Sequence, residues 1–321
     1  MPLLPPSLPR GRRSLAGGAR GVERRRTRWR TILVASLPVT ALTVYRAGLS
    51  VRCLAGPTAA TGGLPLRFDF CGQPESYTPI FEALPSANTA STNAGDFNLY
   101  VGGGAINRAF QMELGLRREN AYQRLHEDML VEALSRPGEL VAAPADWPAL
   151  KELKLLGCFA RVPPGAADAV GVAFVDVFHE SGRPRHDKNV AMLYVVGPKG
   201  QGSVGGGGRT YADSEAFLKA MEDTGSNALS AVSAYNARAA TPGLGLPRLE
   251  VVQWCLVSGG VYRHPKTSKL DVAAATVKGM LAGSSAEGGA EAASLPVVRF
   301  AYDEGAFEEA VRLVLGGAAR L

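Results

Sequence analysis

Cysteine and histidine are scarce in this chain of 321 residues, and neither is spaced as in a metal site. The cysteines are widely separated and form no C-x-x-C pair, which excludes a zinc ribbon and a disulfide framework; they are Cys53, Cys71, Cys158 and Cys255. The four histidines also lack the spacing of metal ligands. We therefore expect no metal site and no bound cofactor.

Acidic residues are nearly absent from the first 30 residues, which hold nine arginines and one glutamate. Because the whole chain has a net charge of +6, the part after Arg30 carries about −2. That part contains no stripe of lysine and arginine with interleaved aromatic residues, the pattern typical of nucleic-acid readout. We expect no nucleic-acid partner.

Long hydrophobic runs are also missing. The apolar run at residues 31–45 has fifteen residues and contains Pro38, which is too short for a transmembrane helix, so no stable membrane insertion is expected. The arginine-rich, acid-poor start is typical of a mitochondrial or plastid transit peptide. A secretory signal and an untargeted extension, which would leave the protein in the cytoplasm, are the alternatives. We predict a disordered or targeting extension over residues 1–62 and one domain over residues 63–316.

Within that domain, apolar segments of strand length alternate with helical patterns. Strands are expected at residues 64–70, 139–148, 170–178, 192–196 and 249–257. Helices are expected at residues 105–134 and 214–240. This alternation predicts an α/β fold with a mixed, mostly parallel central sheet between helices. Small residues predict a flexible glycine-rich insertion near residues 199–213 and a linker at residues 279–294.

The most informative motif is a run of three glycines before a helical pattern that begins at Ala105. Successive glycines let main-chain N–H groups approach a ligand closely. The first turn of a helix adds N–H groups without a carbonyl partner, together with the positive end of the helix dipole. The motif therefore predicts a site for a phosphate, a diphosphate or another anion. A glycine turn that only caps the helix is the alternative.

Residues 93–110 resemble the first ligand loop of macrodomains, the modules that bind ADP-ribose. That family has two asparagines separated by two alanines, then three glycines and a helix that begins A-I-x-x-A; this chain is shorter after the glycines. Further segments resemble the family's motifs in the family's order, at residues 161–167, 190–198, 257–265, 271–281 and 297–315. The chain is therefore identified as a divergent member of the macrodomain family, which implies a three-layer α/β/α fold.

In macrodomains two loops hold the diphosphate of ADP-ribose through main-chain N–H groups, and the resemblance places both loops in this chain. The first would consist of Gly102, Gly103, Gly104 and Ala105. The second would consist of Ser258, Gly259, Gly260, Val261 and Tyr262. Glycine-rich main chain suits a diphosphate because it supplies donors from two sides without side-chain bulk. Tyr262 and His264 would shape the ribose end of the cleft, and the more ordinary expectation for His264 is a side chain that faces the solvent.

The resemblance also places residues around the ribose and the adenine. Asn93 matches the asparagine that approaches the distal ribose, Asp96 stands in place of the second asparagine, and Asn98 follows it. Asn93 and Asp96 would be the catalytic residues of an enzyme. Asp69 matches the acid that accepts from the adenine amino group. Tyr302 matches a ring that stacks on adenine, and a tyrosine packed in the core is the alternative.

The resemblance implies a function in ADP-ribose recognition. The leading hypothesis is a monomeric domain that binds ADP-ribose or an ADP-ribosylated protein. The alternative is an ADP-ribosyl hydrolase that acts on proteins or on small ADP-ribose derivatives. Family hydrolases often carry an aspartate after the glycines, where this chain has Ala105 and Ile106, and this counts against hydrolysis more than against binding. A third hypothesis is a degenerate macrodomain that serves as a scaffold.

Overall fold

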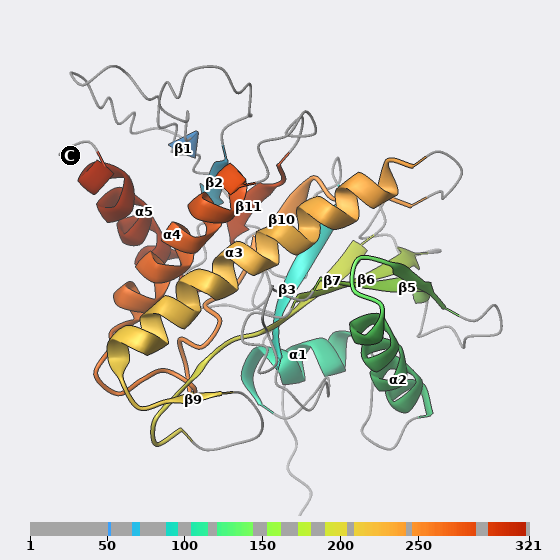
Figure 1. Cartoon of the computed structure of the whole chain (residues 1–321), viewed down its shortest axis with the longest axis horizontal. Helices are drawn as coiled ribbons and strands as arrows, with labels where there is room; N and C mark the ends of the chain where they lie inside the picture. Colours follow the sequence, from blue (N-terminus) through green and yellow to red (C-terminus); the bar gives the residue numbers. More distant parts are fainter. Residues whose placement is uncertain are drawn as a thin grey trace, which may run out of the picture.

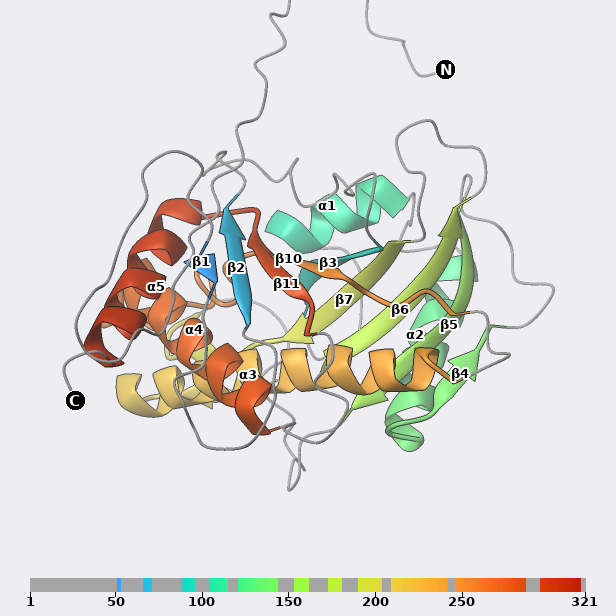
Figure 2. The same cartoon turned by 90° about the horizontal axis from the view of Figure 1, so that it is seen from above.

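The described part of the chain forms a sheet covered by helices on both faces (Figures 1 and 2). The computed structural model describes residues 51–52, 66–70, 88–95, 104–114, 121–143, 153–161, 173–180, 190–203, 209–241, 246–286 and 295–318. Within these residues one sheet has nine strands and a second, small sheet has two.

The large sheet is parallel in its centre and antiparallel at both flanks. In spatial order its strands are β1 (Val51–Arg52), β2 (Arg67–Phe70), β11 (Val297–Phe300), β10 (Val251–Trp254), β3 (Thr89–Gly95), β7 (Val190–Val196), β6 (Ala173–Glu180), β5 (Leu153–Arg161) and β4 (Leu140–Ala142). The neighbouring strands β2, β11, β10, β3 and β7 pair in parallel, whereas the outer pairs are antiparallel. The small sheet consists of β8 (Lys199–Gly200) and β9 (Thr210–Tyr211). The predicted mixed sheet is confirmed.

Helices cover the two faces of the sheet unequally. They are α1 (Ala105–Leu114), α2 (Ala121–Ser135), α3 (Ser214–Ala239), α4 (Lys269–Ala286) and α5 (Glu304–Ala318). Helix α1 lies on one face and α3 crosses the other (Figure 2), with α4 packed against α3 and α5 against α4. The single helical region predicted at residues 105–134 is two helices, α1 and α2; the segment 115–120 lies outside the described residues.

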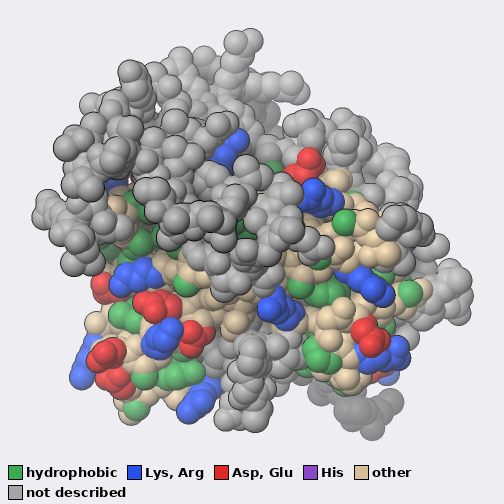
Figure 3. Space-filling model, turned by 45° about the horizontal axis from the view of Figure 1, so that its top comes forward, with side chains coloured by type: hydrophobic (Ala, Val, Ile, Leu, Met, Phe, Trp, Pro, Cys, Tyr) green, Lys and Arg blue, Asp and Glu red, His purple; other side chains and the backbone are tan. Residues whose placement is uncertain are grey.

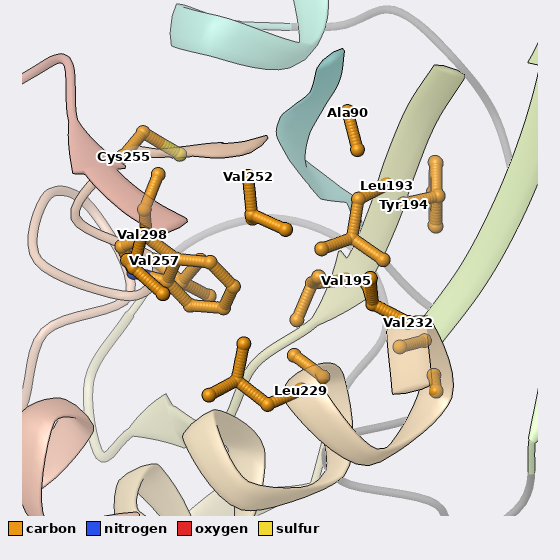
Figure 4. Close-up of a cluster of buried hydrophobic side chains, with 14 of the residues drawn as sticks. Ala90, Leu193, Tyr194, Val195, Leu229, Val232, Val252, Cys255, Val257 and Val298 are labelled. Carbon is orange, nitrogen blue, oxygen red and sulfur yellow. The ribbon is translucent and has the colours of Figure 1, made fainter. Parts of the chain in front are cut away.

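The core lies between the sheet and α3. Residues 191–196 of β7 are all buried, as expected for a parallel strand covered on both faces. Leu229 and Val232 point from α3 toward the sheet, where Leu193, Val195 and Val252 lie (Figure 4). At the far side of the same face, Phe300 of β11 stacks on Phe307 of α5 with ring centroids 4.0 Å apart.

Helices α3 and α4 approach each other over small residues. A Cβ added to Gly279 would lie 1.8 Å from the main-chain oxygen of Glu222, and one added to Gly225 would lie 2.5 Å from that of Thr276. Gly283 is similarly close to Ser226. The linker predicted from residue 279 is therefore wrong up to Ala286, because these small residues belong to α4 and pack against α3; residues 287–294 lie outside the described part.

Helix α4 begins with reciprocal hydrogen bonds between Ser268 and Asp271. The main-chain N–H and the hydroxyl of Ser268 donate to Asp271 Oδ2 at 2.7 and 2.8 Å, and the Asp271 N–H donates to Ser268 Oγ at 3.1 Å. This arrangement satisfies donors that a helix start leaves without partners. The N–H of Ser268, and then its hydroxyl, hold the pKa of Asp271 below its ordinary value of 3.8.

Replacing Ser268 by alanine should lower the free energy of unfolding by about 1 kcal/mol at neutral pH.

Since the pKa of Asp271 is lowered by folding, the stability that its carboxylate contributes is complete above the ordinary value of 3.8 and is lost as the pH falls through the lower folded pKa. Urea unfolding of the wild type and the Asp271→Asn variant should thus differ at neutral pH and converge in acid. A difference that persists in acid would contradict this account.

Candidate functional site

The parallel centre of the sheet gathers three strand ends at one edge. Strand β10 pairs directly with β3 on one side and with β11 on the other, so the segments that follow these strands start from the same edge. The chain continues from β3 to α1 on one face and from β10 to α4 on the other (Figure 2). The two predicted glycine loops therefore follow neighbouring strands at a topological switch point.

The first loop is described only at its end. Gly104 and Ala105 are exposed, and Gly104 O accepts from the Arg108 N–H at 3.2 Å where α1 begins. A Cβ on Gly104 would meet no atom within 4 Å. Four predicted site residues lie outside the described part, so their placement stays a prediction: Asp96, Asn98, Gly102 and Gly103.

The second loop is described throughout. Its turn is closed by the Gly259 N–H, which donates to Leu256 O at 3.1 Å, and by Gly260 O, which accepts from the Arg263 N–H at 3.0 Å. Among the described residues, no main-chain oxygen accepts from the N–H groups of Gly260 or Val261. Both residues are exposed, and Val261 retains 70% of its accessible surface.

The two glycines of the second loop have different surroundings. A Cβ on Gly259 would lie 2.2 Å from the Leu256 side chain, so packing requires glycine there. A Cβ on Gly260 would meet no atom within 4 Å. Gly260 thus faces open space beside main-chain donors, which is the arrangement that an anion site needs.

Backbone strain gathers at the same edge. In the described part of the chain, three non-glycine residues have positive φ: Ala105 (49°), Ser258 (55°) and Asp303 (55°). They follow β3, β10 and β11, which are adjacent strands. Positive φ in such residues costs about 1–3 kcal/mol each and is typical of functional sites.

The glycine-rich segment predicted as an insertion contacts the second loop. The Gly200 N–H donates to Tyr262 O at 2.8 Å, and the Ser258 hydroxyl donates to Pro198 O at 2.6 Å. A Cβ on Gly200 would lie 2.3 Å from the Cα of His264. The described ends of this segment therefore hold the second loop in place; residues 204–208 are not among the described ones.

His264 is buried, so the expectation that it faces the solvent is wrong. Its Nε2 lies 3.1 Å from Ala212 O, and its Nδ1 accepts from the Lys266 N–H at 3.2 Å. Both ring nitrogens therefore bind main chain, and the imidazole joins the segment before α3 to the turn after the second loop.

Asn93 lies near the end of β3 and is fully buried. Its Nδ2 donates to Oδ1 of Asn107 in α1 at 2.9 Å. Sequence reasoning did not single out Asn107; a polar residue in the first turn of a helix gives no sign in the sequence of whether it faces the sheet or the solvent. The structure brings together Asn93 and the start of α1.

The residues predicted at the adenine end lie on β2 and after β11. Asp69 accepts from Arg67 Nε at 3.1 Å and its side chain is 13% exposed. It stands in register with Arg299, whose guanidinium donates to Gln253 at 3.0 Å on the next strand. Tyr302 is half-buried and precedes Asp303, which binds Lys269 at 2.7 Å.

Cys255 directly follows β10 and carries a protonated thiol at neutral pH. Burial raises the pKa of the Cys255 thiol to about 12, and the charge of Asp303 adds to the effect, so this thiol stays protonated at neutral pH.

The described residues contain no group of three histidine, cysteine, aspartate or glutamate side chains that could hold a metal ion. None of the described helices is both long enough and apolar enough to cross a membrane.

Sequence comparison shows that the chain is similar to proteins of Plasmodium and Toxoplasma. It is 32% identical over 247 residues to the DNA/RNA-binding protein ALBA4 of Plasmodium falciparum, a match that covers 74% of this chain and 63% of that protein. It is 25% identical over 221 residues to mitochondrial association factor 1 form b0 of Toxoplasma gondii, covering 61% of this chain and 46% of that protein. The chain thus spans less than two thirds of the length of these curated relatives. No family model matches the chain.

The chain resembles solved macrodomains in fold. A macrodomain mutant of Oceanobacillus iheyensis is 12% identical, with a TM-score of 0.42, and the match covers 81% of this chain and 97% of that one. The Trypanosoma brucei macrodomain in complex with ADP-ribose is 13% identical, with a TM-score of 0.39, covering 78% of this chain and 69% of that one.

Proposed function

We propose that this domain, which we place at residues 63–316, binds ADP-ribose, either free or attached to a protein, through main-chain N–H groups of its two glycine loops. The observation that carries the proposal is the direct pairing of β3 with β10. This pairing starts both loops from adjacent strands, and the described end of each loop has an exposed glycine that faces open space.

The diphosphate is the part of the ligand that this geometry explains best. Its oxygens would accept from the N–H groups of Gly260 and Val261 on one side and from the first turn of α1, after Gly104, on the other. Ser258, Gly259 and Tyr262 would shape the second loop, and Gly102, Gly103 and Ala105 the first. The residues with strained backbone follow three adjacent strands, and this supports the placement of the ligand site at that edge of the sheet.

For the two ends of the ligand, the proposal follows the resemblance to macrodomains. Tyr302 and Asp69 would contact the adenine, and Asn93, Asp96 and Asn98 the distal ribose. A hydrolase would need a water activated beside that ribose, and the one acid proposed there is Asp96. The aspartate that family hydrolases often carry after the glycines is replaced in this chain by Ala105 and Ile106. We therefore favour binding over hydrolysis.

Calorimetry with the full chain tests this proposal. ADP-ribose should bind, whereas ribose 5-phosphate, which lacks the diphosphate and the adenine, should not. No heat and no thermal shift at millimolar ADP-ribose would reject binding and leave the scaffold hypothesis. Release of ADP-ribose from a modified protein, abolished by Asp96→Ala, would instead establish the hydrolase.

A second candidate function is binding of nucleic acid, because the Plasmodium relatives are named DNA/RNA-binding proteins. One observation favours it: beside the second loop, Lys199 Nζ lies 5.8 Å from the Tyr262 ring centroid and Arg209 Cζ lies 5.5 Å from that of Tyr211. Cations combined with aromatic rings suit bases and phosphates. On the face in Figure 3, however, basic and acidic side chains of the described residues are intermixed, and no larger basic surface is visible there.

Fluorescence anisotropy with a labelled single-stranded RNA distinguishes the two functions. If this surface binds RNA, Lys199→Ala and Arg209→Ala should each weaken binding, and affinity should fall steeply with salt. Wild-type protein that binds ADP-ribose but no RNA would exclude the second candidate.

The amino-terminal segment is proposed as a targeting sequence for a mitochondrion or plastid. Its support is the arginine-rich, acid-poor composition of the first 30 residues. Residues 1–62 fused to a fluorescent protein should direct it to the organelle, and a diffuse cytoplasmic signal would contradict the proposal.

A further inference from the structure

Two asparagine side chains are buried against each other where β3 meets α1. Asn93 has no exposed surface and Asn107 retains 7%. The Nδ2 of Asn93 donates to Asn107 Oδ1 at 2.9 Å and lies 3.5 Å from the Sδ of Met192 on β7. Both hydrogens of this amide nitrogen therefore have an acceptor, one of them the weakly accepting thioether.

With Asn107 presenting its oxygen, these contacts fix which way the Asn93 amide is turned. If the Asn93 amide alone were reversed, its oxygen would face the Asn107 oxygen and the Met192 sulfur, which are both acceptors. Asn93 Oδ1 must therefore point away from them. It is buried there without a hydrogen-bond partner among the described residues, and an unsatisfied buried carbonyl carries a desolvation cost.

An oxygen in this position discriminates between ligand groups. It can accept a hydrogen bond and cannot donate one, so it favours a hydroxyl and disfavours a phosphate or carboxylate oxygen. Because Asn93 is fully buried, a ligand hydroxyl reaches this oxygen only if the residues that cover it shift.

We propose that Asn107 is a positioning residue: by holding the Asn93 amide in one orientation, it makes this end of the site select a sugar hydroxyl. The inference rests on the proposed function, because the distal ribose of ADP-ribose supplies that hydroxyl. Asn107 acts through Asn93 and does not itself touch the ligand.

The test compares the affinities for ADP-ribose and for ADP, which lacks the distal ribose, by calorimetry. The full chain is used as wild type, Asn93→Ala, Asn107→Ala and the double variant. Asn107→Ala should reduce the preference for ADP-ribose over ADP by about tenfold, and in the Asn93→Ala background it should change this preference no further. Asn107→Asp keeps an acceptor oxygen for Asn93 Nδ2, so it should retain most of the preference.

The possible failures are distinguishable. An equal loss of affinity for both ligands in Asn107→Ala, or a loss of preference that adds to that of Asn93→Ala, would show a merely structural role and overturn the inference while ADP-ribose binding stands. Wild-type protein that binds neither ligand would overturn the proposed function and the inference together. Should Asn107→Ala fail to fold, Asn107→Ser removes the same contact with less loss of volume, and the same two outcomes apply to it.

Discussion

Gly260→Val should weaken ADP-ribose binding by about 100-fold, or about 2.7 kcal/mol, without changing the thermal midpoint. A side chain at Gly260 meets no protein atom within 4 Å, and its backbone lies outside the left-handed region. Valine would therefore fit the fold, yet it would occupy the space proposed for the diphosphate and screen the N–H groups of Gly260 and Val261. The loss corresponds to one or two hydrogen bonds to a charged group.

The neighbouring glycine provides the matched control. Gly259→Ala places a Cβ 2.2 Å from the Leu256 side chain, so it should lower the thermal midpoint as well as affinity. Gly104→Val tests the first loop in the same way as Gly260→Val, because it also faces open space. Wild-type affinity in both Gly104→Val and Gly260→Val would contradict the two-loop account.

Gly279→Ala should destabilise the fold by about 3 kcal/mol. Its Cβ would lie 1.8 Å from the main-chain oxygen of Glu222, and a main-chain atom of α3 can yield only if the two helices separate. In a domain of this size, the loss corresponds to roughly 6–12 °C in thermal midpoint.

Gly316→Ala is the control for the stability experiment. Gly316 lies in α5 and a Cβ there meets no atom within 4 Å, so alanine should leave stability unchanged or raise it by up to about 1 kcal/mol. Calorimetric unfolding of the three proteins measures both effects. If Gly279→Ala unfolds at the wild-type temperature, the close packing of α3 and α4 is contradicted.

Sequence patterns predicted the helices and strands whose apolar residues pack into the main core. The predicted helix at residues 214–240 matches α3 (Ser214–Ala239), and the predicted strand at residues 192–196 lies within β7 (Val190–Val196). The apolar side of α3 packs on the sheet, so its helical periodicity reports the element directly, whereas β7 is covered on both faces and is reported by a short, continuous apolar run.

Other elements depend on contacts that the sequence does not display. Gly279 and Gly283 resemble linker glycines, yet they are small because α3 passes close to them. Strand β5 (Leu153–Arg161) was not predicted; it belongs to the antiparallel flank. His264 resembles a surface residue beside a proline, but it binds main chain from a segment about 50 residues earlier (Ala212).

For the candidate site, the sequence predicted the chemistry of the loops but not how the fold brings them together. The glycine motifs predicted an anion site, because glycine near a helix start has a direct physical meaning. That the loops follow directly paired strands is a matter of sheet order, which required the structure. The partnership of Asn93 with Asn107 depends on which face α1 turns toward the sheet.

A crystal structure of the chain with ADP-ribose tests the central claim most directly. The account predicts diphosphate oxygens within about 3 Å of the N–H groups of Gly260 and Val261, with the first turn of α1 on the opposite side. A nucleotide bound elsewhere, or no bound nucleotide in crystals whose second loop is free of lattice contacts, would contradict it.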